Sequence, residues 1–162
     1  MIQATTESSF TAYINTEANR INTSVASTQI RHLMKFTNDL DGAVFYAYGT
    51  TETIYNRYTR FTFAYTASPA VPNIYIGQTR LLPAGYYKYE AWEVSWTGTV
   101  TVSLNNAPAT ETDVLPIAAT HGVVEGLVAI GKLNLSEKSG TGQVRYTQNS
   151  PASETNYIWY GQ

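Results

Sequence analysis

The sequence contains no cysteine and few charged residues. The lack of cysteine excludes disulfide bonds and thiolate metal sites, and it leaves the cellular compartment open, because such chains occur both in the cytosol and outside the cell. Charged residues make up only 14% of the 162 residues, and the formal net charge is -2. The basic residues are scattered singly and form no patch, so we expect no direct contact with nucleic acid.

Long apolar runs are also absent. Each run is interrupted by glycine or a charged residue well before the roughly 18 residues that a membrane helix requires, so we expect no membrane partner. In place of charge the chain has 13 tyrosines and abundant threonine. Aromatic and β-branched side chains fit the pleated surface of a sheet, so this composition favours strands.

Residues 85–96, with the sequence GYYKYEAWEVSW, form the strand around which we expect the fold to be organised. Alternation divides its apolar residues between two faces, with Tyr87, Tyr89 and Ala91 on one and Trp92, Val94 and Trp96 on the other. The apolar set therefore changes sides halfway along the strand. This change predicts either a β-bulge, which would carry the strand from one sheet of a sandwich to the other, or a strand that packs in two places.

The other segments also alternate and are separated by turn residues. We expect a hairpin from residues 30–37 and 44–48. A second hairpin is expected between the central strand and residues 100–104, after a tight turn. Glycines within residues 123–135 predict a strand with bulges or close backbone approaches. The remaining predicted strands are at residues 53–66, 74–76 and 144–146, and the aromatic residues 157–160 are expected to pair in the sheet or to dock on a neighbour.

Residues 1–28 differ from the rest of the sequence. Ser, Thr or Asn occupies 13 of these 28 positions, and aliphatic residues are sparse. Apolar residues at helical spacing leave a short amphipathic helix open, although the intervening poor helix formers favour extended structure. We therefore predict an all-β fold, with an antiparallel sandwich or barrel-like domain of residues 29–162 and a polar N-terminal arm of residues 1–28 that is extended or weakly ordered.

Two glutamates on the central strand are the main candidates for catalytic chemistry. Glu90 and Glu93 lie beside aromatic residues, in the manner of the paired carboxylates of a glycosidase. Three residues apart on a regular strand they face opposite sides, whereas glycoside hydrolysis needs both carboxyl groups at one sugar bond. We therefore expect no enzymatic activity from this pair, and we identify no catalytic residue.

Other candidate ligands fit structural roles better. The sequence DLDG at residues 39–42 resembles a fragment of a calcium loop, but its further ligands are missing and a hairpin turn explains it. His32 lies in the apolar phase of its strand and His121 in a loop, and the sequence suggests no third ligand for either. The GTG sequence at residues 140–142 lacks the strand, helix and lysine of a phosphate loop. The sequence therefore predicts no metal and no cofactor.

The polar N-terminal arm and five stretches distributed over most of the chain carry a family resemblance: MKFTNDLDG, NRYTRFTF, PAGYYKYEAWEVSW, APATETDVLP and TNYIWYG. Together they resemble small β-rich virion proteins of tailed bacteriophages, particularly marine ones. The resemblance implies a non-enzymatic structural protein of the virion, assembled in the host cytoplasm. It also implies many copies per particle or a homo-oligomer, with the major capsid protein or other virion proteins as partners.

Within that class, we favour a capsid decoration (cement) protein that binds between capsid subunits. A head-to-tail connector usually carries a charge bias near the DNA path and a fibre usually shows repeats, neither of which is seen here; connector, tail and fibre roles stay as alternatives. The rival from another class is a carbohydrate-binding module or adhesin whose rings stack on sugars. The excess of aromatic residues predicts an interface, which we expect at Phe10, Tyr13, Ile14, Tyr157, Trp159 and Tyr160.

Overall fold

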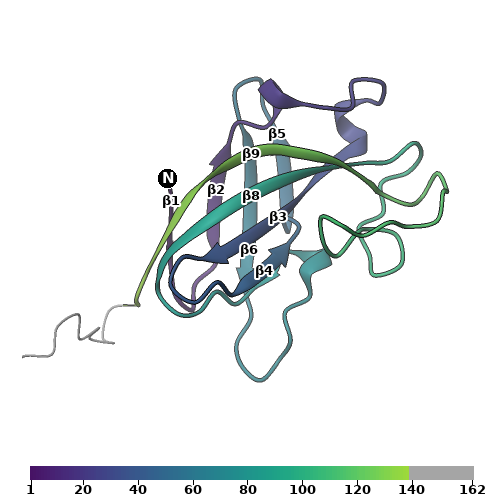
Figure 1. Ribbon diagram of the computed structural model, residues 1–162. Helices are drawn as coiled ribbons and strands as arrows, with labels where there is room; N and C mark the ends of the chain where they lie inside the picture. Colours follow the sequence, from purple (N-terminus) through teal and green to yellow (C-terminus); the bar gives the residue numbers. More distant parts are fainter. Residues whose placement is uncertain (139–162) are drawn as a thin grey trace, which may run out of the picture.

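Figure 1 shows the computed structural model of the chain, which describes residues 1–138. Its strands are β1 (Ile2–Thr5), β2 (Phe10–Ile14), β3 (Ile30–Asn38), β4 (Val44–Ala47), β5 (Thr51–Ile54), β6 (Thr59–Tyr65), β7 (Gln78–Thr79), β8 (Gly85–Ser95) and β9 (Val123–Ser136). The helical elements of the described residues are short 3-10 turns: η1 (Glu17–Asn19), η2 (Ser27–Gln29) and η3 (Ile74–Ile76).

The strands form two sheets that pack face to face (Figure 1). The larger sheet has the order β1-β9-β8-β3-β4, and the smaller has the order β2-β6-β5 with β7 beside β6. Neighbouring strands are antiparallel except for β1 with β9 and β6 with β7. Because the two sheets stay separate, the predicted all-β sandwich is confirmed, and a closed barrel is not formed.

The inner core lies between the two sheets, where alternate side chains of both meet. Its most deeply buried members are Ala12, Met34, Phe36, Ala47, Phe61, Phe63, Tyr87, Ala91 and Leu133. Phe10 stacks on Phe63 with 4.9 Å between ring centroids and meets Phe36 edge-on at 6.2 Å. Such ring pairs add about 0.5–1.5 kcal/mol each beyond the area they bury, so these aromatics stabilise the contact between the sheets.

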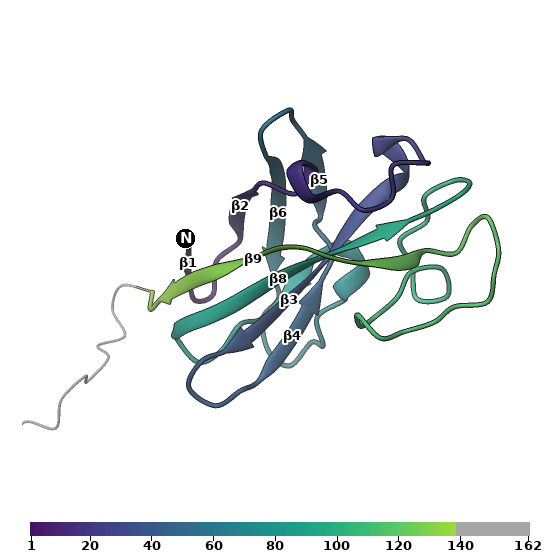
Figure 2. The same cartoon turned by 45° about the horizontal axis from the view of Figure 1, so that its top comes forward.

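A second core cluster lies on the outer face of the larger sheet. It consists of Leu33, Tyr48, Val94, Trp96 and Ala107. Residues 97–122, which connect β8 to β9, cover it and lie at one end of the sheet (Figure 2). The Trp96 indole N–H donates to the carbonyl of Thr120 at 3.1 Å, and this bond fixes the loop against the ring. The predicted strand at residues 100–104 is wrong, because this segment is a loop packed on the cluster and the neighbours of β8 are β3 and β9.

The change of apolar side in β8 is explained by burial on both faces. β8 pairs with β3 without any shift, from Ser95 opposite Ile30 to Tyr87 opposite Asn38, so β8 itself contains no bulge on that side. The register shifts lie on the β9 side, where Val128 and Glu125 are the extra residues of two bulges. The glycine-rich segment is therefore a bulged strand, as predicted, and β8 packs against the inner core at one end and the second cluster at the other.

The N-terminal residues are part of the sandwich. β1 pairs in parallel with β9, and β2 pairs with β6, so residues 1–28 contribute a strand to each sheet. Ile2, Ala4, Ala12 and Ile14 are all buried in the inner core. The predicted extended structure is confirmed for β1 and β2, but the separate arm is wrong, because four small or aliphatic side chains suffice to dock these strands.

Other local predictions have mixed outcomes. The hairpin of β3 and β4 is confirmed. The long strand at residues 53–66 is instead the β5–β6 hairpin, closed by a hydrogen bond from the Tyr55 N–H to the Tyr58 carbonyl at 2.9 Å. Residues 74–76 form the 3-10 turn η3, which the Asn73 side chain caps by accepting the Tyr75 N–H. The strand predicted at residues 144–146 and the aromatic residues 157–160 lie outside the described residues.

Candidate functional site

The two glutamates of the central strand lie on opposite faces, as the sequence predicts. Glu90 is on the outer face, where its carboxylate lies 2.7 Å from the ammonium of Lys88 and 3.7 Å from that of Lys35. Glu93 is fully buried on the inner side and accepts the backbone N–H groups of Ile21 at 3.0 Å and Asn22 at 2.7 Å. The pair therefore provides no converging carboxylates, and Glu93 instead fixes the segment between η1 and η2.

The two histidines have structural partners. The Nδ1 of His32 lies 2.7 Å from a carboxylate oxygen of Glu52, and the other oxygen of Glu52 accepts the His32 backbone N–H at 3.1 Å. His121 lies in the loop that covers the second cluster, where its Nδ1 is 2.6 Å from the carbonyl of Pro116. Within residues 1–138 no group of three or more potential ligands could hold a metal ion.

The DLDG segment at residues 39–42 is a hairpin turn. Asn38 closes it by accepting the Leu40 N–H on its side-chain oxygen at 2.7 Å. Asp39 binds the ammonium of Lys132, and Asp41 accepts the N–H of Ala43, so both carboxylates are used within the turn region. The GTG sequence at residues 140–142 lies outside the described part of the chain.

A polar network attaches the long loop to the outer face of the larger sheet. Glu111 of the loop binds the Lys35 ammonium and accepts the Tyr46 hydroxyl at 2.6 Å. Burial and the bond to Glu111 raise the pKa of Tyr46 to about 12. Burial alone would raise the pKa of Glu111, but the bonds from Lys35 and Tyr46 outweigh it and hold that pKa below its usual value. The network thus favours the ionised form of Glu111, and this carboxylate holds the loop on the sheet.

A second carboxylate steadies the loop internally. Asp113 accepts the hydroxyl of Thr110 at 2.7 Å and the backbone N–H groups of Ala109 and Thr110 at 2.8 and 3.1 Å. These bonds, that from the Thr110 hydroxyl first, lower the pKa of Asp113. Like Glu111, Asp113 therefore has its hydrogen-bond partners within the protein and serves to hold the loop.

A group of exposed aromatic side chains lies at the smaller sheet, on β2 and on the turn that joins β5 to β6. We define the tyrosine patch as Tyr13, Tyr55, Tyr58 and Arg60. The three tyrosines are 62%, 40% and 38% exposed, respectively. The rings of Tyr13 and Tyr58 meet edge-on at 5.5 Å between centroids, and those of Tyr55 and Tyr58 lie 4.8 Å apart. Strand register builds the patch, because Tyr13 of β2 lies opposite Arg60 of β6.

Charge and ring orientation determine what the tyrosine patch could bind. No carboxylate of residues 1–138 forms an ion pair with Arg60, and its Nε is buried without a hydrogen-bond partner. The interplanar angles are 74° for Tyr13 with Tyr58 and 36° for Tyr55 with Tyr58, so the rings form no single flat platform. One terminal nitrogen of the Arg60 guanidinium donates to the Thr53 hydroxyl at 3.5 Å. An irregular aromatic surface beside an arginine without an ion pair is typical of a protein-binding hot spot.

The predicted interface residues separate into three groups. Tyr13 is exposed, in the tyrosine patch. Phe10 packs against the inner core and Ile14 is only 3% exposed, because strand alternation turns both inward. Tyr157, Trp159 and Tyr160 lie outside the described residues. Tyr58 and Arg60 were not predicted, although the alternation of NRYTRFTF places them on the face opposite Phe61 and Phe63.

No protein-family model, curated protein or solved structure matches this chain. No helix between residues 1 and 138 has the length and apolarity needed to cross a membrane. The basis for a functional proposal in the structure is therefore the exposed surface of the described residues.

Proposed function

We propose that the protein is a non-enzymatic structural component of a tailed-bacteriophage virion, most consistent with a capsid decoration protein that binds between capsid subunits. The observation that carries the proposal is the tyrosine patch: three exposed tyrosines beside Arg60, a half-buried arginine that forms no ion pair with any carboxylate of residues 1–138. The sequence resemblance supplies the virion context, with the major capsid protein as partner and many copies per particle.

The chemistry of the tyrosine patch suits a protein partner. Tyrosine and arginine are enriched among the residues that dominate binding energy at protein interfaces. The Arg60 guanidinium offers directional donors, so the partner surface would present carboxylate or carbonyl oxygens to it. A modest affinity per copy would still reinforce a particle, because many copies attached to one lattice add their contributions. Connector, tail and fibre roles would use the same surface on a different partner.

The test uses particles that lack the protein, to which purified protein is added back. Tyr13→Ser and Tyr58→Ser should each reduce binding to the particles by about fivefold or more, since hot-spot truncations cost over 1 kcal/mol. Tyr86→Ser is a matched control, because Tyr86 is a tyrosine of similar exposure, 56%, on the larger sheet. Equal loss for all three variants, or no loss for the patch variants, would contradict the assignment of the tyrosine patch.

A carbohydrate-binding role is the second candidate, favoured by the threonines beside the patch. Thr11, Thr62 and Thr51 lie opposite one another across β2, β6 and β5, one step along from the tyrosines. Hydroxyl groups next to aromatic rings are typical of sugar sites. The inclined rings disfavour this role, because a sugar stacks on an accessible flat face. Binding of the free protein to a host glycan, abolished by Tyr13→Ser, would replace the decoration role with an adhesin role.

A further inference from the structure

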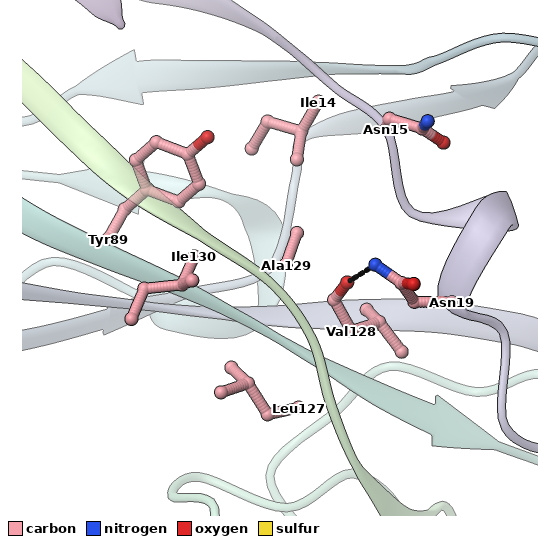
Figure 3. Close-up of a pocket in the computed structure, with 8 residues that line it drawn as sticks. All are labelled: Ile14, Asn15, Asn19, Tyr89, Leu127, Val128, Ala129 and Ile130. Atoms are coloured by element: carbon pink, nitrogen blue, oxygen red, sulfur yellow. Dashed lines mark hydrogen bonds between the residues drawn. The ribbon is translucent and has the colours of Figure 1, made fainter.

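One side of the sandwich is open between the edges of the two sheets. A groove of about 480 Å³ lies there, between residues 127–130 of β9 and the segment from Ile14 to Asn19 (Figure 3). β1 covers the β9 edge only from Leu133 to Ser136, so the preceding part of β9 has no neighbouring strand on this side among the described residues. The Asn19 amide reaches across the groove to the Val128 carbonyl at 2.9 Å. Apart from the Val128 carbonyl, which Asn19 occupies, this part of the β9 edge is without a strand partner among the described residues.

The walls of the groove are apolar on both sides of this edge. Ile14, Tyr89 and Ala129 line it from the inner core. Leu127 and Ile130 lie on the outer face and are 41% and 59% exposed. Residues 126–131 contain no charge, although exposed edges are usually protected by charged side chains, proline or a covering segment. A strand seated here would meet apolar surface on both of its faces.

We propose that residues 157–160 of the same chain, Tyr-Ile-Trp-Tyr, occupy this groove as an added strand antiparallel to β9. This inference is independent of the virion role. Alternation gives the segment large apolar side chains on both faces, which matches the two apolar walls. It carries no charge, so its burial between the sheets leaves no unpaired ion. Main-chain hydrogen bonds to the β9 edge would provide the attachment.

The geometry of the connection permits this arrangement. The described chain leaves the sandwich on the same side as the groove, where the Lys138 N–H donates to the Thr6 hydroxyl at 3.0 Å. From residue 138 back along β9 to residue 131, the near end of the groove, the distance is about 23 Å at the rise of a strand. Residues 139–156 can span up to roughly 60 Å when extended. The linker is therefore longer than the distance that it has to bridge. Such a linker holds residues 157–160 at an effective concentration near the millimolar range, which favours the chain's own segment over that of another molecule.

Paired cysteines test the proposal in the full-length protein, because the natural chain contains none. Ile130→Cys is combined with Ile158→Cys or, for the opposite face of the added strand, with Trp159→Cys. Val44→Cys is the matched control partner: it is 44% exposed but lies on β4, at the other edge of the same sheet. After mild oxidation we expect an intramolecular cross-link to Ile130→Cys at least fivefold more abundant than to Val44→Cys.

Two outcomes of the cross-linking would overturn the proposal. Equal yields with Ile130→Cys and Val44→Cys would show that the segment does not prefer the groove. Disulfide-linked dimers in place of cross-linked monomers would assign the groove to a neighbouring copy.

Amide hydrogen exchange provides a second measurement on the full-length chain. Trp159→Ser should accelerate exchange at residues 127–130 by about tenfold, because their edge N–H groups would lose their partners. Leu40→Ser, at an 84% exposed turn position, is the control and should leave these rates unchanged. Unaltered exchange in the Trp159→Ser variant would also reject the proposal.

Discussion

Replacing Glu93 by glutamine isolates the contribution of one buried carboxylate, because Glu90 on the same strand permits the same chemical change on the opposite face. Glu93 accepts two backbone N–H groups, from Ile21 and Asn22, with one oxygen each. Glutamine keeps one acceptor and turns an NH₂ group toward the other donor. A hydrogen bond to a charged group is worth about 1.5–3 kcal/mol, so we expect Glu93→Gln to cost about 2–4 kcal/mol.

The same change at Glu90 should have a much smaller effect. Its partners Lys35 and Lys88 have side chains that are 20% and 42% exposed, and ion pairs near the surface contribute about 1 kcal/mol or less. Urea denaturation followed by tryptophan fluorescence would measure both free energies of unfolding. In thermal melts the Glu93→Gln loss corresponds to a lowering of Tm by about 4–16 °C for a domain of this size. Equal losses at the two positions, or a loss under 1 kcal/mol at Glu93, would refute the structural role assigned to that carboxylate.

Three further predictions concern packing and pH. Trp96→Ala removes a fully buried ring and should lower the free energy of unfolding in urea by about 3–5 kcal/mol; a change under 1 kcal/mol would contradict its place in the second cluster. Gly131→Ala would bring a Cβ to 2.6 Å from the Tyr89 hydroxyl oxygen, so calorimetry should show a destabilisation of about 1–3 kcal/mol rather than the gain that alanine brings to an open site. Because the pKa of Glu111 is lowered on folding, its stabilising contribution is present above its usual pKa and is lost as pH falls through the folded value; Glu111→Gln should therefore flatten the decline of stability on acidification, and an unchanged pH profile would count against the network.

The parts of the fold that follow from local pattern were predictable from the sequence. The alternation in residues 30–37 and the turn at 38–42 predict the β3–β4 hairpin, and the three-residue spacing of Glu90 and Glu93 predicts their opposite faces. In each case the information lies within one strand or one turn. The all-β class follows from the same period-two patterns and from the scarcity of good helix formers.

The parts that depend on distant pairing were not predictable. Val100 and Val102 alternate as a strand would, yet the partner position beside β8 is taken by β9, and the segment packs as a loop. Residues 1–28 are too polar to suggest core strands, and only the edges offered by β9 and β6 make them so. The tyrosine patch likewise joins Tyr13 of β2 to Tyr58 of the β5–β6 turn, and no local signal specifies the pairing of β2 with β6 that brings the two rings together.

The parallel pairing of β1 with β9 has a consequence for how the protein is made. The first strand emerges from the ribosome well before its partner, since Ile2 pairs with Leu133. At translation rates of 5–20 residues per second, this delay is on the order of ten seconds, during which β1 has no edge to join. The larger sheet can therefore be completed only after β9 is synthesised, and pairings so distant in sequence make folding slow. A nascent chain stalled before residue 133 would expose the apolar side chains of β1 and β2, which makes the incomplete product a natural target for chaperones and proteases.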